Sequence, residues 1–159
     1  MKKVIVSLCA IISVSLFTIS CSKEENTNSS SARNLQQEDS NKQLVLTFYQ
    51  KLFGDKDLSA IDDYIATDYI QHNPQVADGK DALKKMAAQW IAGGPKTTVD
   101  VHQSVAEGNL VVLHVKNPTP DGKYLAIAEF FRVENNKIVE HWDVIQSAPD
   151  TSANPHPMF

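Results

Sequence analysis

FRVENNKIVEHWDVIQ, residues 131–146, is the stretch that decides the fold. Two runs rich in β-branched and aromatic residues, Lys123–Val133 and Lys137–Gln146, meet across the polar segment Glu134–Asn136. Long β-rich runs separated by a few turn-forming residues are typical of a hairpin. The sequence therefore predicts two long antiparallel strands at the C-terminal end of the domain.

Two shorter strands are expected before this hairpin. Thr97–Ala106 alternates apolar and polar residues, and Leu110–Lys116 is a further β-rich run. Glu107–Asn109 is predicted to be the turn between them, and Asp121–Gly122 is a strong turn signal before the long hairpin. Consecutive strands joined in this way predict a four-stranded antiparallel meander.

Three helices are expected before the strands, because apolar residues recur there at three- and four-residue spacings. The first starts near Asn41, with Ser40 or Asp39 as its cap, and ends at Gly54. The remaining upstream elements are a second helix over Leu58–Ile65, an extended piece at Tyr69–Pro74, and a third helix that opens at Asp78–Asp81 and ends at Gly93–Pro95.

This order of elements predicts an α+β fold, in which three N-terminal helices pack on one face of a curved antiparallel sheet of about four main strands. A sheet that curls around one long helix encloses a conical cavity, which is a common kind of ligand site. We predict one domain over residues 40–150, followed by a tail at 151–159.

The first 39 residues have a different character. Met1–Lys3 is positive, and Val4–Ile19 is an almost uninterrupted run of apolar and small residues. Because that run is short for a bilayer span, residues 1–20 are predicted to be a signal peptide, with a retained membrane anchor helix as the alternative. Residues 21–39 are mostly polar and are predicted to form a flexible linker.

Charge and cysteine content exclude several functions. Without Lys2 and Lys3 the chain has 13 basic and 19 acidic residues, a formal net charge of −6, which argues against nucleic acid as a partner. Cys9 lies in the predicted signal peptide, so Cys21 has no cysteine to pair with after cleavage. The sequence therefore predicts neither a disulfide framework nor a thiol nucleophile.

The segment Thr18–Cys21 resembles the lipobox of bacterial lipoproteins, although those boxes usually carry Leu where Thr18 stands. The following residues, Ser22–Glu25, are similar to the acidic export signal of surface lipoproteins in the Bacteroidetes. This resemblance implies that Cys21 carries lipid, including palmitate. It also implies that the domain is anchored in the bacterial cell envelope, at the outer membrane or on the cell surface.

Two further motifs resemble one known family. Residues 68–74 read DYIQHNP, with Gly79–Lys80 after them, and the C-terminal motif is the one at 131–146. Both resemble the SnoaL-like polyketide cyclase branch of the nuclear transport factor 2-like superfamily. The tail, with Met158–Phe159 at its end, resembles a subgroup described as predicted aldol-condensation-catalysing enzymes. The resemblance implies the conical fold but no single activity, because the superfamily contains enzymes, binding modules and scaffolds.

Strand alternation and this resemblance together select the catalytic candidates. Side chains two residues apart share a face of a strand, so His141 and Asp143 point the same way. Glu129 and Phe131 join them on the concave face, because the position matching Glu129 is an acid inside the cone of the related ketosteroid isomerases. Asp143 matches the proposed acid/base of the polyketide cyclases. The alternatives are a surface carboxylate or ion pair at Asp143 and a cross-strand ion pair at Glu129.

Histidines and aromatic residues supply the other candidates. The resemblance places His72 at the pocket mouth as a catalytic candidate, with a turn histidine bonded to backbone as the alternative. His114 is a substrate-binding candidate, or else a satisfied core or surface residue. The remaining predicted substrate-binding residues, whose alternative role is core packing or the pocket wall, are Asn73, Tyr69, Trp90, Phe131 and Tyr49.

An intramolecular aldol closure needs a proton removed next to a carbonyl, the enolate stabilised, and a proton delivered to the second carbonyl. Side chains can do all three, so no cofactor is predicted. A metal site is the alternative use of His72, His114, His141 and Asp143. Their spacing does not match a helical metal motif, so their convergence would depend on the fold, and no metal is predicted.

Three functions stay open at this point. The first is a cofactor-free lyase, isomerase or cyclase that acts on a small carbonyl compound. The second is a module that captures a small apolar ligand, and the third is a structural partner in the envelope. Trp142 lies on the opposite strand face from Asp143, and we predict that it is buried in a homodimer interface on the outer face of the sheet.

Overall fold

The computed structural model describes residues 33–159. The predicted signal peptide, Cys21 and the linker up to residue 32 lie outside the described residues. Within the described part, no helix has the length and apolar character needed to cross a membrane. The elements in chain order are α1 (Leu35–Tyr49), a π-helical turn η1 (Gln50–Gly54), α2 (Ser59–Tyr64), β1 (Ile65–Gln71), α3 (Lys80–Trp90), β2 (Asp100–Glu107), β3 (Leu110–Pro118), β4 (Tyr124–Glu134) and β5 (Lys137–Ser147).

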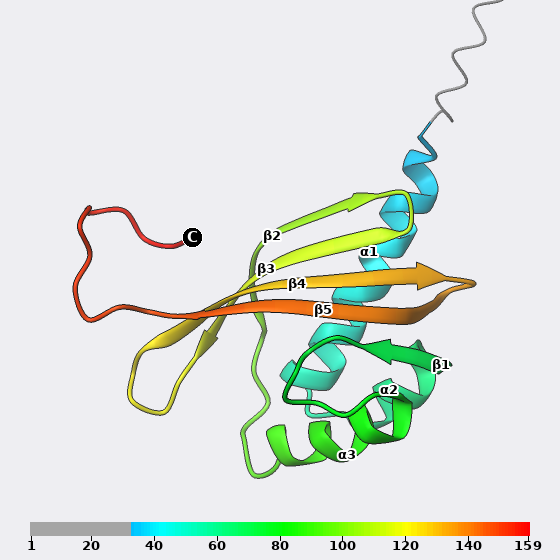
Figure 1. Cartoon of the computed structure of the whole chain (residues 1–159), viewed down its shortest axis with the longest axis horizontal. Coiled ribbons are helices and arrows are strands. Elements are labelled where there is room, and N and C mark those ends of the chain that lie inside the picture. The colour runs from blue at the N-terminus through cyan, green and yellow to red at the C-terminus, as the bar shows by residue number, and fades with distance from the viewer. Residues whose placement is uncertain (1–32) are drawn as a thin grey trace, which may run out of the picture. The chain divides into compact units, whose positions relative to one another are not determined.

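The strands form one curved sheet in the order β1-β5-β4-β3-β2, with helices against one of its faces (Figure 1). The predicted α+β architecture is confirmed, but the sheet has five strands and is mixed, because β1 pairs in parallel with β5. The extended piece predicted at Tyr69–Pro74 overlaps the C-terminal end of β1 (Ile65–Gln71). Its burial does not alternate, and its pairing shifts between Ile65 and Ile70, so a period-two pattern could not reveal the whole strand.

Helix α1 begins at Leu35, six residues before the predicted start at Asn41, so residues 35–39 are helix and not linker. The Asn34 side chain caps the helix by accepting a hydrogen bond from the Gln37 backbone N–H at 3.1 Å. Glu38 in the first turn is buried and accepts from the Arg33 guanidinium and from the Gly108 backbone N–H. Polar composition suggested a linker here, but these polar side chains bond to the domain.

The β4–β5 hairpin turns through Asn135 and Asn136, which both have positive φ, of 50° and 59°. Asparagine tolerates this left-handed region, and two such residues suit the tight hairpin turns that match sheet twist. Glu134 pairs with Lys137, but the register shifts by one residue before Arg132 pairs with Glu140. The extra residue is Val139, which makes a β-bulge in β5.

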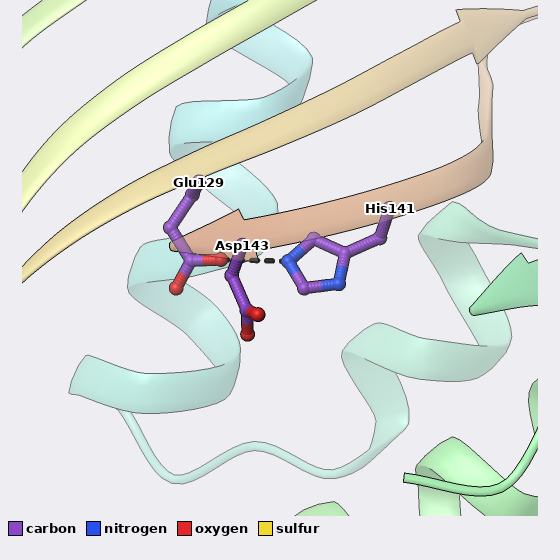
Figure 2. Close-up of side chains that lie close together, drawn as sticks. All are labelled: Glu129, His141 and Asp143. Carbon is purple, nitrogen blue, oxygen red and sulfur yellow. Dashed lines mark hydrogen bonds and ion pairs between the residues drawn. The ribbon is translucent and has the colours of Figure 1, made fainter. Parts of the chain in front are cut away.

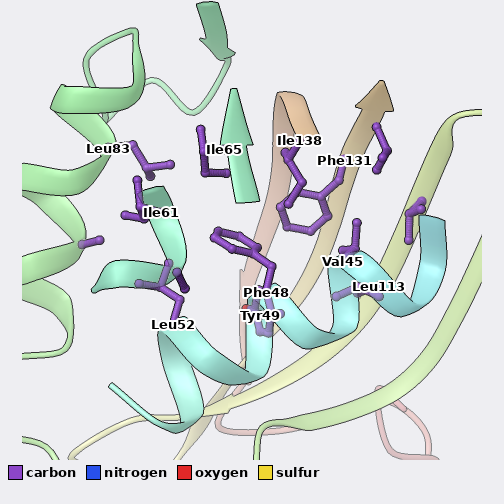
Figure 3. Close-up of a cluster of buried hydrophobic side chains, with 14 of the residues drawn as sticks. Val45, Phe48, Tyr49, Leu52, Ile61, Ile65, Leu83, Leu113, Phe131 and Ile138 are labelled. Carbon is purple, nitrogen blue, oxygen red and sulfur yellow. The ribbon is translucent and has the colours of Figure 1, made fainter. Parts of the chain in front are cut away.

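The hydrophobic core lies between the helices and the inner face of the sheet (Figure 3). Val45, Phe48 and Leu52 from the first helical segment are almost fully buried, as their three- and four-residue spacing predicts. Leu113 and Ile138 meet them from the sheet. Each such side chain contributes roughly 1.5–3 kcal/mol of burial free energy, so the face of the sheet that carries them is strongly specified.

The early start of α1 gives a stability prediction. Replacing Asn34 with Ala removes the cap, and the free energy of unfolding should fall by about 1 kcal/mol in a urea titration. The exposed Gln36 lies in the same turn and has no capping role, so Gln36→Ala is the matched control and should be neutral. Equal stability of the Asn34→Ala and Gln36→Ala chains would contradict a helix that starts at Leu35.

Candidate active site

Two carboxylates and one imidazole meet on the inner face of the sheet (Figure 2). Glu129 on β4 lies directly opposite Asp143 on β5, and Phe131 lies opposite His141. One ligand atom each of Glu129, His141 and Asp143 lies within 4.8 Å of the other two. Only 7% of Glu129 and 9% of His141 is exposed, so these groups interact in surroundings largely shielded from water.

Glu129 and His141 share a short contact of 2.6 Å between Oε2 and Nε2. The other imidazole nitrogen, Nδ1, lies 2.9 Å from the Gln71 side-chain oxygen. That oxygen also accepts a hydrogen bond from the Asn73 backbone N–H at 3.0 Å. Because a backbone N–H can only donate, the Gln71 atom that faces it must be the amide oxygen, and this fixes the orientation of the amide. Nδ1 of His141 therefore carries a proton, and the contact with Glu129 holds one further proton shared between Nε2 and the carboxylate.

Tyrosine hydroxyls complete the buried end of the site. Tyr49 donates a hydrogen bond to Glu129 Oε1 at 2.9 Å. Burial, together with the negative charge of Glu129, raises the pKa of the Tyr49 hydroxyl well above its ordinary value. Burial first, and then the charges of Glu129 and Asp143, also raises the pKa of the Tyr69 hydroxyl. Both tyrosines are therefore neutral at physiological pH. Tyr49 donates to Glu129, whereas Tyr69 accepts from the Gln71 amide.

Asp143 lies at the open end of this group. Its Oδ2 accepts a hydrogen bond from the Asn73 side-chain amide at 2.5 Å, and the residue is only partly buried. Two residues further along the same face of β5, Ile145 is 49% exposed. Exposure thus rises from His141 through Asp143 to Ile145, so a ligand would approach the group from the Ile145 end.

Two hollows in the described part of the chain lie away from the group formed by Glu129, His141 and Asp143. One hollow is lined by residues at the start of α1 and at the β2–β3 and β4–β5 turns, and the other lies beside Thr119 and Ser147. Neither is lined by Glu129, His141 or Asp143. The aromatic side chains of Tyr49, Tyr69 and Phe131 are buried in the interior around these groups.

The placement of His72 at a pocket mouth is wrong. The backbone N–H of His72 bonds to the His141 carbonyl, and its imidazole points to the outer face of the sheet. There it lies 2.8 Å from Glu140 and stacks on Trp142 with ring centroids 4.7 Å apart. The reason is strand alternation: Gln71 points inward next to His141, so the following residue points outward.

His114 is likewise outside the site. It pairs with Ala128 on β4, whereas its neighbour Leu113 pairs with Glu129 and points inward. The predicted pocket-wall residue Trp90 is 48% exposed at the end of α3, where its ring contacts Phe53. Because these histidines face away from His141, the four-residue metal set considered from the sequence does not converge.

Glu129, His141 and Asp143 form a different donor set, which includes two carboxylates and an imidazole. Such donors suit divalent transition ions in general. The hydrogen bonds that these residues make do not require an ion, because among the described residues no buried side-chain nitrogen or oxygen lacks a partner. A shared proton is sufficient to explain the contact between Glu129 and His141.

Gln71 is the site residue that sequence reasoning missed. Tyr69, Gln71 and Asn73 alternate along one extended segment, and all three reach the site: the Gln71 amide donates to the Tyr69 hydroxyl at 3.0 Å. The period-two spacing of these polar residues was a usable signal. The spacing could not identify His141 as the partner of Gln71, because the β1–β5 pairing joins residues about 70 positions apart.

Comparison with solved structures places this fold in the nuclear transport factor 2-like class. A protein of unknown function of this class from Burkholderia xenovorans LB400 is 17% identical, with a TM-score of 0.62 over 74% of this chain and 91% of that one. A proposed ketosteroid isomerase from Kribbella flavida DSM 17836 is 15% identical, with a TM-score of 0.59 over 74% and 86%. An LEH-like epoxide hydrolase from M. tuberculosis is 14% identical, with a TM-score of 0.56 over 69% and 85%.

The family model for the SnoaL-like polyketide cyclases matches residues 43–151, more than half of the chain. The chain belongs to this family. No curated protein sequence matches it. At identities of this size the structural likeness shows the fold and leaves the activity to be argued from the site.

The role of Gln71 can be tested without a substrate. In Gln71→Leu the acceptor for Nδ1 is lost, so His141 should shift to the tautomer protonated at Nε2, and stability should fall by roughly 1–3 kcal/mol. Imidazole nitrogen chemical shifts measured by NMR report the tautomer directly. Gln71→Glu retains an acceptor and should keep Nδ1 protonated. An unprotonated Nδ1 in the unmodified chain would overturn the assignment.

Proposed function

We propose that this protein is a cofactor-free acid/base enzyme that acts on a small carbonyl compound, as an aldol-type cyclase, lyase or isomerase. The single observation that carries the proposal is the convergence of Glu129, His141 and Asp143 within 4.8 Å on the inner face of the sheet. A partly accessible carboxylate beside a largely buried group that holds a proton supplies both halves of acid/base chemistry.

Asp143 is the proposed base. Its position at the open end allows its free oxygen to reach a carbon next to a substrate carbonyl, while Asn73 holds the other oxygen. Removal of the proton forms an enolate and a neutral Asp143 carboxyl group. The Asn73 amide fixes the direction of the carboxylate, which matters because proton transfer requires close approach and alignment.

The Glu129–His141 pair is the proposed acid. The proton shared between Nε2 of His141 and Glu129 can move toward the enolate oxygen, and the Tyr49 hydroxyl then stabilises the charge left on Glu129. In an aldol closure the enolate carbon bonds to the second carbonyl carbon, the first carbonyl forms again, and its proton returns to the Glu129–His141 pair. The new alkoxide takes the proton held by Asp143, so both groups regain their starting states and no proton is gained or lost overall.

A non-catalytic module that binds a small ligand is the second candidate. The observation that favours it is that, within the described residues, the buried polar groups of the site already satisfy one another. In such a module Asp143 and Asn73 would orient a ligand at the Ile145 end without proton transfer. The two candidates differ in the expected effect of a neutral side chain at position 143. It would lower the turnover of an enzyme, whereas it would leave a binding module unaffected.

We propose further that Cys21 carries lipid and tethers the domain in the bacterial cell envelope. The support is the lipobox-like segment that ends at this cysteine. A homodimer through the outer face of the sheet is part of the same proposal. Val144 is 64% exposed on that face and Ile70 is 45% exposed, while Trp142 between them is partly covered by His72 and Arg132 of its own chain.

The function is tested by measuring the melting temperature of the chain with a panel of small carbonyl and ring compounds, followed by turnover of any compound that binds. A ligand that binds only the folded state raises the melting temperature. Asp143→Asn should still bind the compound but should lower kcat by about 10²- to 10⁴-fold, because it removes the base and leaves the shape unchanged.

Glu140→Gln is the matched control, since Glu140 lies on the same strand but faces the opposite side with Arg132 and His72. This variant should keep full turnover. Binding without turnover in the unmodified chain, unaffected by Asp143→Asn, would favour the binding module. Equal losses in both carboxylate variants would show that Asp143 acts through stability and not through chemistry.

A further inference from the structure

Phe159 lies in a cluster of rings and cations on the outer face of the sheet. The ring centroid of Phe159 is 4.6 Å from that of His102 on β2, 4.8 Å from that of His114 on β3 and 5.3 Å from that of Tyr124 on β4. Lys116 Nζ lies 5.0 Å from the Tyr124 ring centroid and 5.8 Å from that of Phe159. We call these four side chains, from His102, His114, Lys116 and Tyr124, the outer cage.

The segment that carries Phe159 is held at both of its ends. Phe159 itself is partly buried. Two contacts nearer the strand hold the start of the tail: the Ala148 backbone N–H bonds to the Tyr124 carbonyl at 2.9 Å, and Asp150 pairs with Lys123. The tail is therefore attached to β4 at its start and returns to the sheet at its end.

The composition of the outer cage suits an aromatic side chain. Rings stack or tilt against rings at centroid distances of 4.5–7 Å, and an ammonium group over a ring face adds an electrostatic attraction. An aliphatic side chain would fill the same space without these contacts. We propose that the outer cage is a recognition site for Phe159 of the chain itself, and that the bound tail shields this part of the sheet from other molecules.

Attachment in the same chain makes such binding effective even if each contact is weak. A short flexible connection gives a local concentration on the order of millimolar, so a site of modest affinity is filled for much of the time. The site is separate from the proposed acid/base group, because His114 and Glu129 point to opposite faces of the sheet. The inference therefore does not depend on whether the protein is an enzyme.

Chemical modification of histidines tests the inference in the full chain. Diethyl pyrocarbonate acylates accessible imidazole nitrogens, and mass spectrometry measures the rate at each histidine. In Phe159→Ala the rate at His114, which is partly buried, should rise several-fold, because the covering ring is gone. The rates at His72 and His141, which do not contact the tail, should stay unchanged.

Two further variants separate recognition of a ring from simple covering. Phe159→Trp should keep His114 protected, whereas Phe159→Leu should expose it nearly as much as Phe159→Ala does. Met158→Ala is the matched control in the tail and should leave the rates near those of the unmodified chain. An unchanged rate at His114 in Phe159→Ala overturns the proposal, and equal protection by Leu and Phe overturns recognition of the ring.

A second measurement requires no substitution. Nuclear Overhauser effects between the Phe159 ring protons and the imidazole protons of His114 are expected in the unmodified chain, since their ring centroids lie 4.8 Å apart. Their absence overturns the proposal even if a variant of Phe159 proved unstable.

Discussion

The register of the β4–β5 hairpin is the constraint on which the site depends. With the two-residue turn alone, Glu134 pairs with Lys137, and a regular ladder would continue with Glu129 opposite Trp142. The bulge at Val139 shifts the pairing by one residue, so that Glu129 lies opposite Asp143 instead. Because a shift of one residue exchanges the two faces of a strand, this single extra residue decides which side chains enter the interior.

The interior can hold these polar groups because each of them has a partner. Removing a carboxylate from water is costly unless it is paired or protonated. Glu129 has the His141 imidazole and the Tyr49 hydroxyl, and Asp143 has the Asn73 amide. Gln71 supports the arrangement from β1, because its oxygen orients the imidazole. The network explains both why the fold tolerates the buried charges and why a proton is held near Asp143.

The two faces of the sheet use the same kinds of residue for different purposes. On the inner face a histidine and two carboxylates meet in surroundings largely shielded from water. On the outer face His72, Glu140 and Arg132 form an ion-pair network, in which the guanidinium of Arg132 lowers the pKa of the Glu140 carboxyl with help from His72. At the other end of that face His102 and His114 contact Phe159. Exposed ion pairs contribute little stability, so the outer network mainly orients side chains.

The sequence by itself determined the parts of this protein that depend on local pattern. Helical spacing identified the buried stripe of α1, and turn residues with β-rich runs identified the four antiparallel strands. Together with the family resemblance, strand alternation placed Glu129, His141 and Asp143 on one face. These features can be predicted from the sequence because hydrophobic periodicity and turn chemistry act over a few neighbouring residues.

Tertiary structure alone decided the rest. The parallel pairing of β1 with β5 brought Gln71 to His141 and turned His72 outward, and the sheet face of His114 followed from its pairing with β4. The polar start of α1 became part of the domain through Glu38 and its partners in the β2–β3 turn. In each case the partner is distant in the chain, and the free energy of such a contact depends on register and burial that no local pattern encodes.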